Sequence, residues 1–319
     1  MSQSTPLLLL GHGTRDTSGS QAFLDFAHKF QSYDPSRPVV PCFLELSDPL
    51  VQVGIDRCVQ MGYQELTVLP VLLFAARHSK FDVTGELDRA LQRHPQLMLR
   101  YGRHFGVSLR WLDLWSQRLT QADCHSPISR DKTVLLFVGR GASDPDANGD
   151  VYKLARMLWE GSGYLDLEVC FTGITHPRLE RGFERARAWQ PERIVVIPHL
   201  LFDGVLAKRI QTVTQQQQVA YPDVEVQTLS VIGADPTLFE LIRDRELEAQ
   251  SDQVAMNCHT CKFRQAVAAN SHGHHHDHQH GHHHGHHHHD HPEGQALYHG
   301  IADLYPEADD YHQRAWQIP

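Results

Sequence analysis

The sequence predicts an α/β protein made of two tandem doubly wound domains, each with a parallel sheet of the flavodoxin-like or Rossmann-like kind. Two observations lead to this fold class. Short apolar runs alternate with helical patterns along most of the 319 residues, and this alternation occurs twice through an internal duplication. The composition then changes abruptly after about Ala268, where a histidine-rich tail begins.

The duplication becomes visible when the sequence is compared with itself at an offset of 128 residues. Residues 8–13 then align with 136–141, and residues 69–74 align with 197–202, with no gap across about seventy residues. A fixed offset of this kind indicates two copies of one structural unit. We expect an N-terminal domain at 1–125, a duplicated domain at 130–250 and a tail at 251–319.

Each copy contains four apolar runs, and a helical pattern follows each run. In the first copy we expect strands at residues 7–10, 39–46, 65–74 and 97–101, and helices at 20–30, 50–61, 84–94 and 108–122. In the second copy we expect strands at 134–138, 167–174, 193–202 and 224–231, and helices at 151–159, 179–189, 208–217 and 237–248. Because the apolar runs do not alternate with polar residues, the strands should form parallel sheets covered on both faces.

The tail has a composition that cannot form a hydrophobic core. Residues 272–291 are nearly all His, Gly, Asp or Gln, and fourteen of them are histidines. A segment with no apolar side chain to bury does not fold alone. We therefore expect this low-complexity segment to be disordered.

Charge and composition exclude several classes of function. The formal net charge of −9 argues against nucleic-acid binding, and no run approaches the roughly 18 apolar residues of a membrane-spanning helix. Six cysteines in a chain of this length do not indicate a disulfide framework. We therefore expect a cytoplasmic protein with neither a nucleic-acid nor a membrane partner.

Histidine and glutamate residues occur where the predicted strands of the first copy end. His12 follows the first strand, Glu45 ends the second, His78 follows the third and His104 follows the fourth. Ligands bind outside the carboxyl ends of parallel strands, so these side chains should meet at one edge of the sheet. His12, Glu45 and His78 are spaced 33 residues apart. Two imidazoles and a carboxylate suit a first-row divalent metal, which we predict that these three residues hold.

Each candidate also has a plainer interpretation. Residues 11–13 are compatible with a phosphate-binding loop at a helix N-terminus, although the full glycine spacing of such loops is missing. Glu45 is compatible with a solvated charge at a strand end. His78 and His104 are compatible with surface histidines that have no direct role.

The second copy helps to separate these interpretations. Its equivalent positions carry Arg140, Gly173 and Leu206, so all three candidate ligands are absent there. Residues that both copies need for folding should be retained in both, as Gly13 and Gly141 are. The joint loss therefore favours a functional site that the protein needs only once.

Three motifs carry the candidate residues, at positions 11–16, 43–46 and 72–82. They resemble the sirohydrochlorin cobaltochelatases of CbiX type, which belong to the class II chelatases, and the resemblance covers about residues 5–250. It extends to the tail, because long CbiX-type proteins carry a histidine-rich segment and a Met-x-Cys-x-x-Cys motif, found here at 256–261. Residues 75–77 read Ala-Ala-Arg where relatives often have a glycine, so this loop departs from the family pattern.

The resemblance implies a lyase that inserts a divalent metal, foremost Co²⁺, into sirohydrochlorin in cobalamin biosynthesis. By the family pattern, His12 and His78 are the metal-binding and catalytic histidines, and Glu45 is the active-site glutamate. Glu45 or a freed histidine would accept the pyrrole protons. The alternatives are insertion of Fe²⁺ for siroheme synthesis, insertion of Ni²⁺ and, from another class, non-enzymatic metal storage or delivery.

Sirohydrochlorin carries carboxylates, so basic side chains at the same edge are candidate substrate ligands. In the first copy these are Arg15, Arg77, Lys80 and Arg103. In the second copy, further candidates are Arg140, Lys208 and Arg209. The alternative for each is a solvated surface charge.

Two features of the tail point to metal chemistry. Cys258 and Cys261 supply half of a four-cysteine site, and the resemblance implies a [4Fe–4S] cluster completed across a homodimer, with reduced thiols in a linker as the alternative. Neutral imidazoles bind borderline divalent metals, so we interpret the histidines as a cobalt or nickel buffer, with a solubilising tether as the alternative. The buffer residues are His272, His274, His275, His276, His282, His283, His284, His286, His287, His288 and His289.

Overall fold

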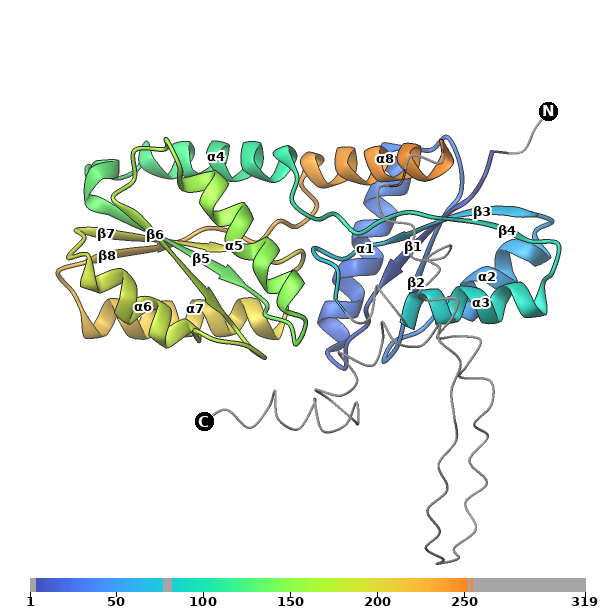
Figure 1. Cartoon of the computed structure of the whole chain (residues 1–319), viewed down its shortest axis with the longest axis horizontal. Coiled ribbons are helices and arrows are strands. Elements are labelled where there is room, and N and C mark those ends of the chain that lie inside the picture. The colour runs from blue at the N-terminus through green and yellow to red at the C-terminus, as the bar shows by residue number, and fades with distance from the viewer. Residues whose placement is uncertain (1–3, 77–81, 252–253, 255–319) are drawn as a thin grey trace, which may run out of the picture. The chain divides into compact units, whose positions relative to one another are not determined.

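The computed structural model describes residues 4–76, 82–251 and 254, all within a compact unit that spans Met1–Gln265. This unit contains two four-stranded parallel sheets, which divide it into an N-terminal half and a C-terminal half (Figure 1). None of the helices in the described ranges is long and apolar enough to cross a bilayer.

Each half alternates strands with helices. The strands of the N-terminal half are β1 (Leu7–Gly11), β2 (Val39–Phe43), β3 (Glu65–Pro70) and β4 (Met98–Tyr101). Its helices are α1 (Thr17–Tyr33), α2 (Val51–Gln60), α3 (Val83–Arg93) and α4 (Leu109–Asp123). After a short 3₁₀ turn, η2 (Arg130–Lys132), come the strands β5 (Thr133–Gly139), β6 (Asp166–Phe171), β7 (Arg193–Pro198) and β8 (Glu225–Thr228). The helices of the C-terminal half are α5 (Pro145–Trp159), α6 (Leu179–Ala188), α7 (Val205–Ala220) and α8 (Pro236–Gln250).

The two sheets have the same strand order, β2-β1-β3-β4 and β6-β5-β7-β8. Each first strand therefore lies inside its sheet and is buried on both faces, which explains its continuous apolar run. Leu8 and Leu10 of β1 pack with α2 and α3, whereas Leu7 and Leu9 belong to the core on the opposite face. That second core continues without interruption into the C-terminal half, so the two halves share one hydrophobic core.

The last helix of each half packs against the other half. Helix α8 packs on β3 and β4 of the N-terminal sheet, while α4 packs against α5 (Figure 1). Phe239 of α8 stacks among Phe26, Phe30 and Tyr33 of the N-terminal half. The boundaries predicted at 1–125 and 130–250 follow the sequence repeat, and in space the two terminal helices are exchanged across it.

Buried polar contacts fix the exchanged helices in place. Trp115 of α4 donates its indole N–H to Nδ1 of His199, which follows β7, at 3.1 Å. Arg37 of the N-terminal half pairs through two guanidinium nitrogens with the Glu246 carboxylate of α8, and both side chains are buried. Removing Trp115 or Glu246 would leave the buried His199 or Arg37 short of a hydrogen-bond partner, which is costly in a dry interior.

Every expected strand and helix is present in the predicted order. Five strands end earlier than expected, and one of them is β8, which ends at Thr228 instead of residue 231. After the other four, the apolar run leaves the sheet and contributes to the lining of a cavity between the halves. These four strands end at Phe43, Pro70, Phe171 and Pro198 instead of residues 46, 74, 174 and 202.

Helices α1 and α5 begin earlier than expected, at Thr17 and Pro145. The Asp16 side chain accepts a hydrogen bond from the backbone N–H of Ser18, and Asp144 caps α5 in the same way. An aspartate at this position satisfies an amide that has no partner inside the helix. The first turn of each helix therefore forms from polar residues that show no apolar periodicity.

Candidate functional site

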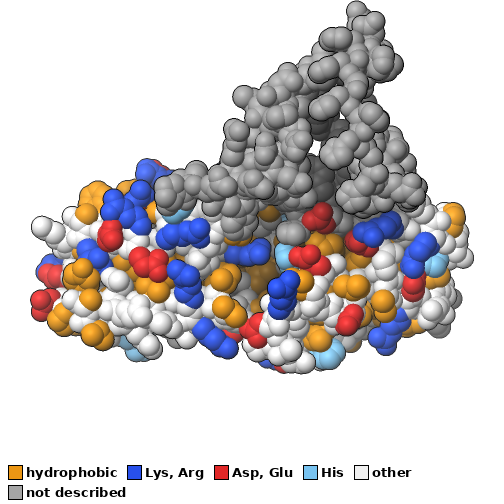
Figure 2. Space-filling model, turned by 90° about the horizontal axis from the view of Figure 1, so that it is seen from below, with side chains coloured by type: hydrophobic (Ala, Val, Ile, Leu, Met, Phe, Trp, Pro, Cys, Tyr) orange, Lys and Arg blue, Asp and Glu red, His pale blue; other side chains and the backbone are white. Residues whose placement is uncertain are grey.

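A cavity of about 650 Å³ lies where the strands of both sheets end. The loops after β1, β2 and β3 line one side, and the equivalent loops after β5, β6 and β7 line the other. Figure 2 looks onto this region, which is hollowed, with hydrophobic side chains inside and basic side chains around it. The volume falls in the range of small-molecule sites in proteins.

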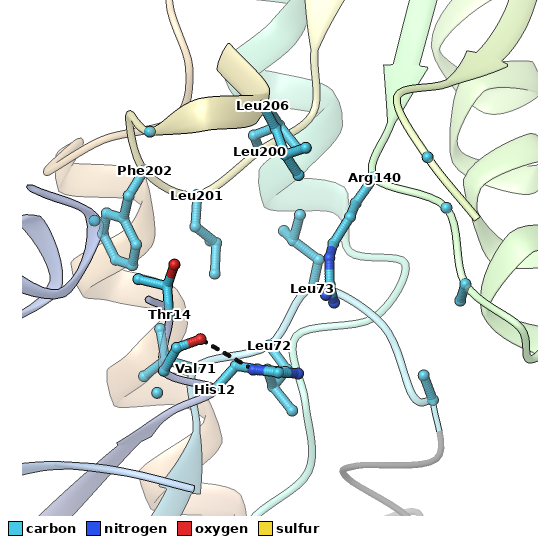
Figure 3. A pocket seen from close by; sticks show the side chains of 18 of the residues that line it. His12, Thr14, Val71, Leu72, Leu73, Arg140, Leu200, Leu201, Phe202 and Leu206 are labelled. Atoms are coloured by element: carbon cyan, nitrogen blue, oxygen red, sulfur yellow. Dashed lines mark hydrogen bonds between the residues drawn. The ribbon is translucent and has the colours of Figure 1, made fainter. Parts of the chain in front are cut away.

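Equivalent apolar residues from the two halves line the cavity. Residues 72–74 after β3 contribute two leucines and a phenylalanine, and residues 200–202 after β7 contribute the same three residue types at the offset of the duplication. Leu206 adds to the second set (Figure 3). The cavity therefore offers apolar surface from both halves to a ligand placed between them.

His12 enters the cavity directly after β1 because the chain turns sharply at Gly13. Gly13 has a φ of 92°, and a Cβ atom there would lie 1.7 Å from the carbonyl oxygen of Glu45. Only glycine allows the loops after β1 and β2 to approach this closely. The Nδ1 atom of His12 lies 3.1 Å from the carbonyl oxygen of Gly13 (Figure 3). When Nδ1 donates its proton to that carbonyl, the lone pair of the neutral imidazole is on Nε2.

Glu45 lies beside His12, as the rule of strand ends predicts. Its Oε1 atom is 3.8 Å from Nδ1 of His12, with the two side chains 47% and 20% exposed respectively. The backbone amide of Glu45 donates to the carbonyl oxygen of His12 at 3.1 Å. The loops after β1 and β2 are therefore bonded to each other, and they hold a carboxylate next to an imidazole.

Arg140 occupies the position in the C-terminal half that His12 occupies in the N-terminal half. Its guanidinium extends into the cavity toward His12 (Figure 3). The side chain reaches solvent, but the surrounding walls lower the pKa of the guanidinium through burial, and the Glu45 carboxylate opposes that shift. The cavity therefore holds the Arg140 cation from one half and the His12 imidazole from the other, with the Glu45 carboxylate beside that imidazole.

The other predicted substrate ligands are placed differently. Arg15 lines the cavity and is exposed. Arg103 instead donates from Nε and Nη2 to the Glu248 carboxylate of α8, at 2.8 and 3.0 Å, and this ion pair raises the pKa of Arg103. Arg209 donates to Glu180 at 3.1 Å on the outer surface of α6 and α7.

Several predicted residues lie outside the described part of the chain. These are the third metal ligand His78, its neighbours Arg77 and Lys80, the cysteines Cys258 and Cys261, and the histidines of residues 272–291. Within the described ranges, no group of three or more His, Cys, Asp or Glu side chains could hold a metal ion. The metal buffer and the [4Fe–4S] cluster stay predictions.

Sequence reasoning missed one histidine of this region. His199 follows β7, lines the cavity wall and is fully buried among the rings of Phe74, Trp111, Trp115 and Phe137. Burial lowers the pKa of His199 to about 3, so the ring is neutral at physiological pH. The first copy has Val71 at this position. A histidine in place of this valine, inside an otherwise apolar run, is the feature of the sequence that marks His199 as unusual.

Comparison with known proteins agrees with the duplicated architecture. A family model described as CbiX matches residues 6–122 and again residues 134–249. A sirohydrochlorin cobaltochelatase of Priestia megaterium is 37% identical over 82% of this chain and 85% of its own length. A sirohydrochlorin ferrochelatase of the same organism is 29% identical over 66% of this chain and 78% of its own length.

A solved structure of SirB from Bacillus subtilis with Fe³⁺ superimposes with a TM-score of 0.67. It is 26% identical in sequence, and the match covers 78% of this chain and 96% of that protein. The two family matches fall on the two halves that the sheets define, and the 37% identical relative is matched over most of its length. The chain therefore belongs to the CbiX family of sirohydrochlorin chelatases.

Proposed function

We propose that this chain is a sirohydrochlorin chelatase that inserts Co²⁺ into the metal-free macrocycle. The observation that carries the proposal is the imidazole of His12, which lines a cavity of about 650 Å³ between two apolar walls and is held 3.8 Å from the carboxylate of Glu45. Metal insertion needs a ligand that releases the metal, a base for the pyrrole protons and a surface for a flat ring. We assign the first task to His12, the second to Glu45 and the third to the apolar walls.

His12 is suited to deliver the metal. Donation of the Nδ1 proton to the Gly13 carbonyl fixes the tautomer and leaves Nε2 as the metal-binding atom. A site with few protein ligands keeps coordination positions open for the ring nitrogens. We propose that His78, the predicted second histidine, completes this site.

Glu45 is suited to accept protons. Insertion releases two protons from pyrrole nitrogens while the metal passes from the protein to the four ring nitrogens. The Glu45 carboxylate lies on the Nδ1 side of His12, away from the proposed metal-binding atom Nε2. This position favours the role of proton acceptor over that of metal ligand.

The basic side chains of the cavity are suited to bind the carboxylates of the substrate. Arg140 reaches in from the C-terminal half, and Arg15 lines the opposite side. A guanidinium binds a carboxylate through paired, charge-assisted hydrogen bonds. With apolar walls for the ring, these two arginines would orient the macrocycle above His12.

The choice of metal follows from the relatives, because nothing in an imidazole–carboxylate pair separates Co²⁺ from Fe²⁺ or Ni²⁺. The relative at 37% identity is named a cobaltochelatase, and the relative at 29% identity is named a ferrochelatase. We therefore place cobalt first. Iron is the second candidate, because the superimposed SirB structure is described with Fe³⁺.

The test is a metallation assay with purified protein, sirohydrochlorin and Co²⁺, Fe²⁺ or Ni²⁺ in turn, followed by the absorption spectrum of the ring. We expect the fastest metallation with Co²⁺ and no metallation by His12→Ala at an unchanged melting temperature. His28→Ala removes an exposed histidine of α1 that does not line the cavity, and it should metallate like the unaltered protein. A protein that binds Co²⁺ without changing the ring spectrum would instead be a storage or delivery protein.

A further inference from the structure

Two apolar residues of the cavity have a backbone conformation that side chains usually avoid. Leu46 has a φ of 63° and Ile174 a φ of 64°. They occupy equivalent positions in the duplication, after β2 and β6, and both line the cavity. A left-handed conformation is uncommon for any residue with a side chain, and for a β-branched isoleucine it is a true outlier.

Among the described residues other than glycine, Gln190 is the one further case of positive φ, and it has an ordinary explanation. Gln190 comes two residues after α6 ends at Ala188, where helices commonly close with a left-handed residue. Leu46 and Ile174 follow strands instead. Their conformation therefore needs another cause.

Both residues sit at the centre of a γ-turn of the rare hand. The amide of Ser47 donates to the carbonyl oxygen of Glu45 at 2.8 Å, and the amide of Thr175 donates to that of Gly173 at 2.7 Å. These hydrogen bonds close a ring around Leu46 in one half and around Ile174 in the other.

The neighbouring loop holds each turn in place. The amides of Glu45 and Gly173 donate to the carbonyl oxygens of His12 and Arg140, both at 3.1 Å. The glycines at 13 and 141 press against the carbonyl oxygens of the same turn residues, as the short distances to an added Cβ show. The surrounding structure thus imposes the strained conformation, which is how such strain persists at ligand-binding sites.

The C-terminal half shows that the side chain, and not only the turn, is retained. A glycine at the centre of this turn would remove the strain. The chain has its glycine one position earlier, at Gly173, and keeps isoleucine at 174. In the N-terminal half, Leu46 is 51% exposed although it is apolar. Each turn therefore presents an apolar side chain to the cavity at the expense of backbone strain.

We propose that Leu46 and Ile174 are positioning residues that contact the apolar ring of the tetrapyrrole, one from each half. This inference rests on the proposed function, since it takes sirohydrochlorin as the ligand of the cavity. The occupant fits because a flat apolar ring needs contacts that its carboxylates do not supply, while Arg15 and Arg140 serve the carboxylates. Leu46 directly follows Glu45, so one strained turn fixes both the contact with the ring and the proposed proton acceptor.

The test measures binding of metal-free sirohydrochlorin to the metal-free protein by absorption titration, together with the melting temperature. Leu46→Gly and Ile174→Gly remove the side chain and relieve the strain, so each should weaken binding about tenfold, equivalent to about 1.4 kcal/mol, without lowering the melting temperature. Gln190→Gly relieves a left-handed residue that does not line the cavity, and it should leave binding unchanged. Leu46→Met keeps an apolar side chain and should restore most of the affinity.

Unchanged binding in both glycine variants would overturn the inference while leaving the proposed function intact. Weaker binding that comes with a lower melting temperature would indicate a structural role and would also overturn it. If the unaltered protein neither bound nor metallated sirohydrochlorin, the proposed function would fail, and this inference with it.

Discussion

The substitution Gly13→Ala tests whether the close approach of two loops positions the active side chains. Gly13 has a φ of 92°, and an added Cβ would lie 1.7 Å from the carbonyl oxygen of Glu45. The contacted atom belongs to the backbone, so the movement of a flexible side chain cannot relieve the contact. The carbonyl would have to move by more than about 1 Å to reach an ordinary contact distance.

The expected cost is about 3 kcal/mol of folding free energy. About 1 kcal/mol comes from placing alanine in the left-handed region. About 1 kcal/mol more comes from each of two strained hydrogen bonds, namely Glu45 N–H to His12 and Ser47 N–H to Glu45. At about 2–4 °C per kcal/mol for a unit of this size, the melting temperature should fall by about 6–12 °C.

Gly141→Ala is the matched control, because Gly141 has a φ of 86° and an added Cβ would lie 2.1 Å from the carbonyl oxygen of Gly173. The two variants should lose similar stability. In metallation assays, Gly13→Ala should lower kcat because it displaces Glu45, whereas Gly141→Ala should raise KM and spare kcat. Equal loss of kcat in both variants, or a melting temperature of Gly13→Ala within about 2 °C of the unaltered protein, would refute the reasoning.

Two further predictions concern the exchanged helices. Glu246→Ala removes the carboxylate that pairs with two guanidinium nitrogens of the buried Arg37, while the Asp34 carboxylate stays 3.3 Å from Nη1. Urea unfolding should therefore show a loss of about 3 kcal/mol, the low end of the cost of breaking a buried ion pair, and a loss below about 1 kcal/mol would contradict this. Burial lowers the pKa of His199 from 6.5 to about 3, so the unfolded chain binds a proton that the folded chain does not between those pH values, and stability falls on acidification. His199→Phe should therefore lower the free energy of unfolding at pH 7, because Trp115 loses its hydrogen-bond acceptor. The same variant should lose less stability between pH 7 and pH 5, by up to about 1.4 kcal/mol per pH unit. An unchanged pH dependence of unfolding would exclude His199 as its source.

The strands and their order could be predicted because each half repeats the same apolar pattern. The exchange of α4 and α8 between the two halves could not be predicted from the sequence. Their periodicity shows that both helices are amphipathic, but it contains no information about which sheet each one covers. That choice is made by contacts such as Trp115 with His199 and Arg37 with Glu246, which join residues far apart in the sequence.

The candidate site could likewise be predicted only in part. His12 and Glu45 were predicted because the carboxyl ends of parallel strands converge, and the structure brings the two side chains together. The sequence does not predict the γ-turns at Leu46 and Ile174, because the apolar runs favour strands that extend to these two residues. A leucine in an apolar run predicts a strand, and its left-handed backbone arises only from the neighbouring loop that packs against it.

The duplication explains why equivalent loops of the two halves line the cavity, although the side chains at its active positions differ. Both halves keep what shapes the cavity, including the glycine pair at 13 and 141, the strained turns and the apolar sets at 72–74 and 200–202. Only the N-terminal half has a histidine and a glutamate at the positions of His12 and Glu45, and the C-terminal half has Arg140 and Gly173 there. A flat macrocycle turns one face toward each half, so apolar walls on both sides suit it. A metal ion enters the ring from one face, and a second set of ligands opposite the first would compete for the same ion. An arginine on that side would repel the cation and attract the carboxylates of the ring. With the macrocycle bound as proposed, this chemical difference between the two equivalent walls would set the face that meets the metal.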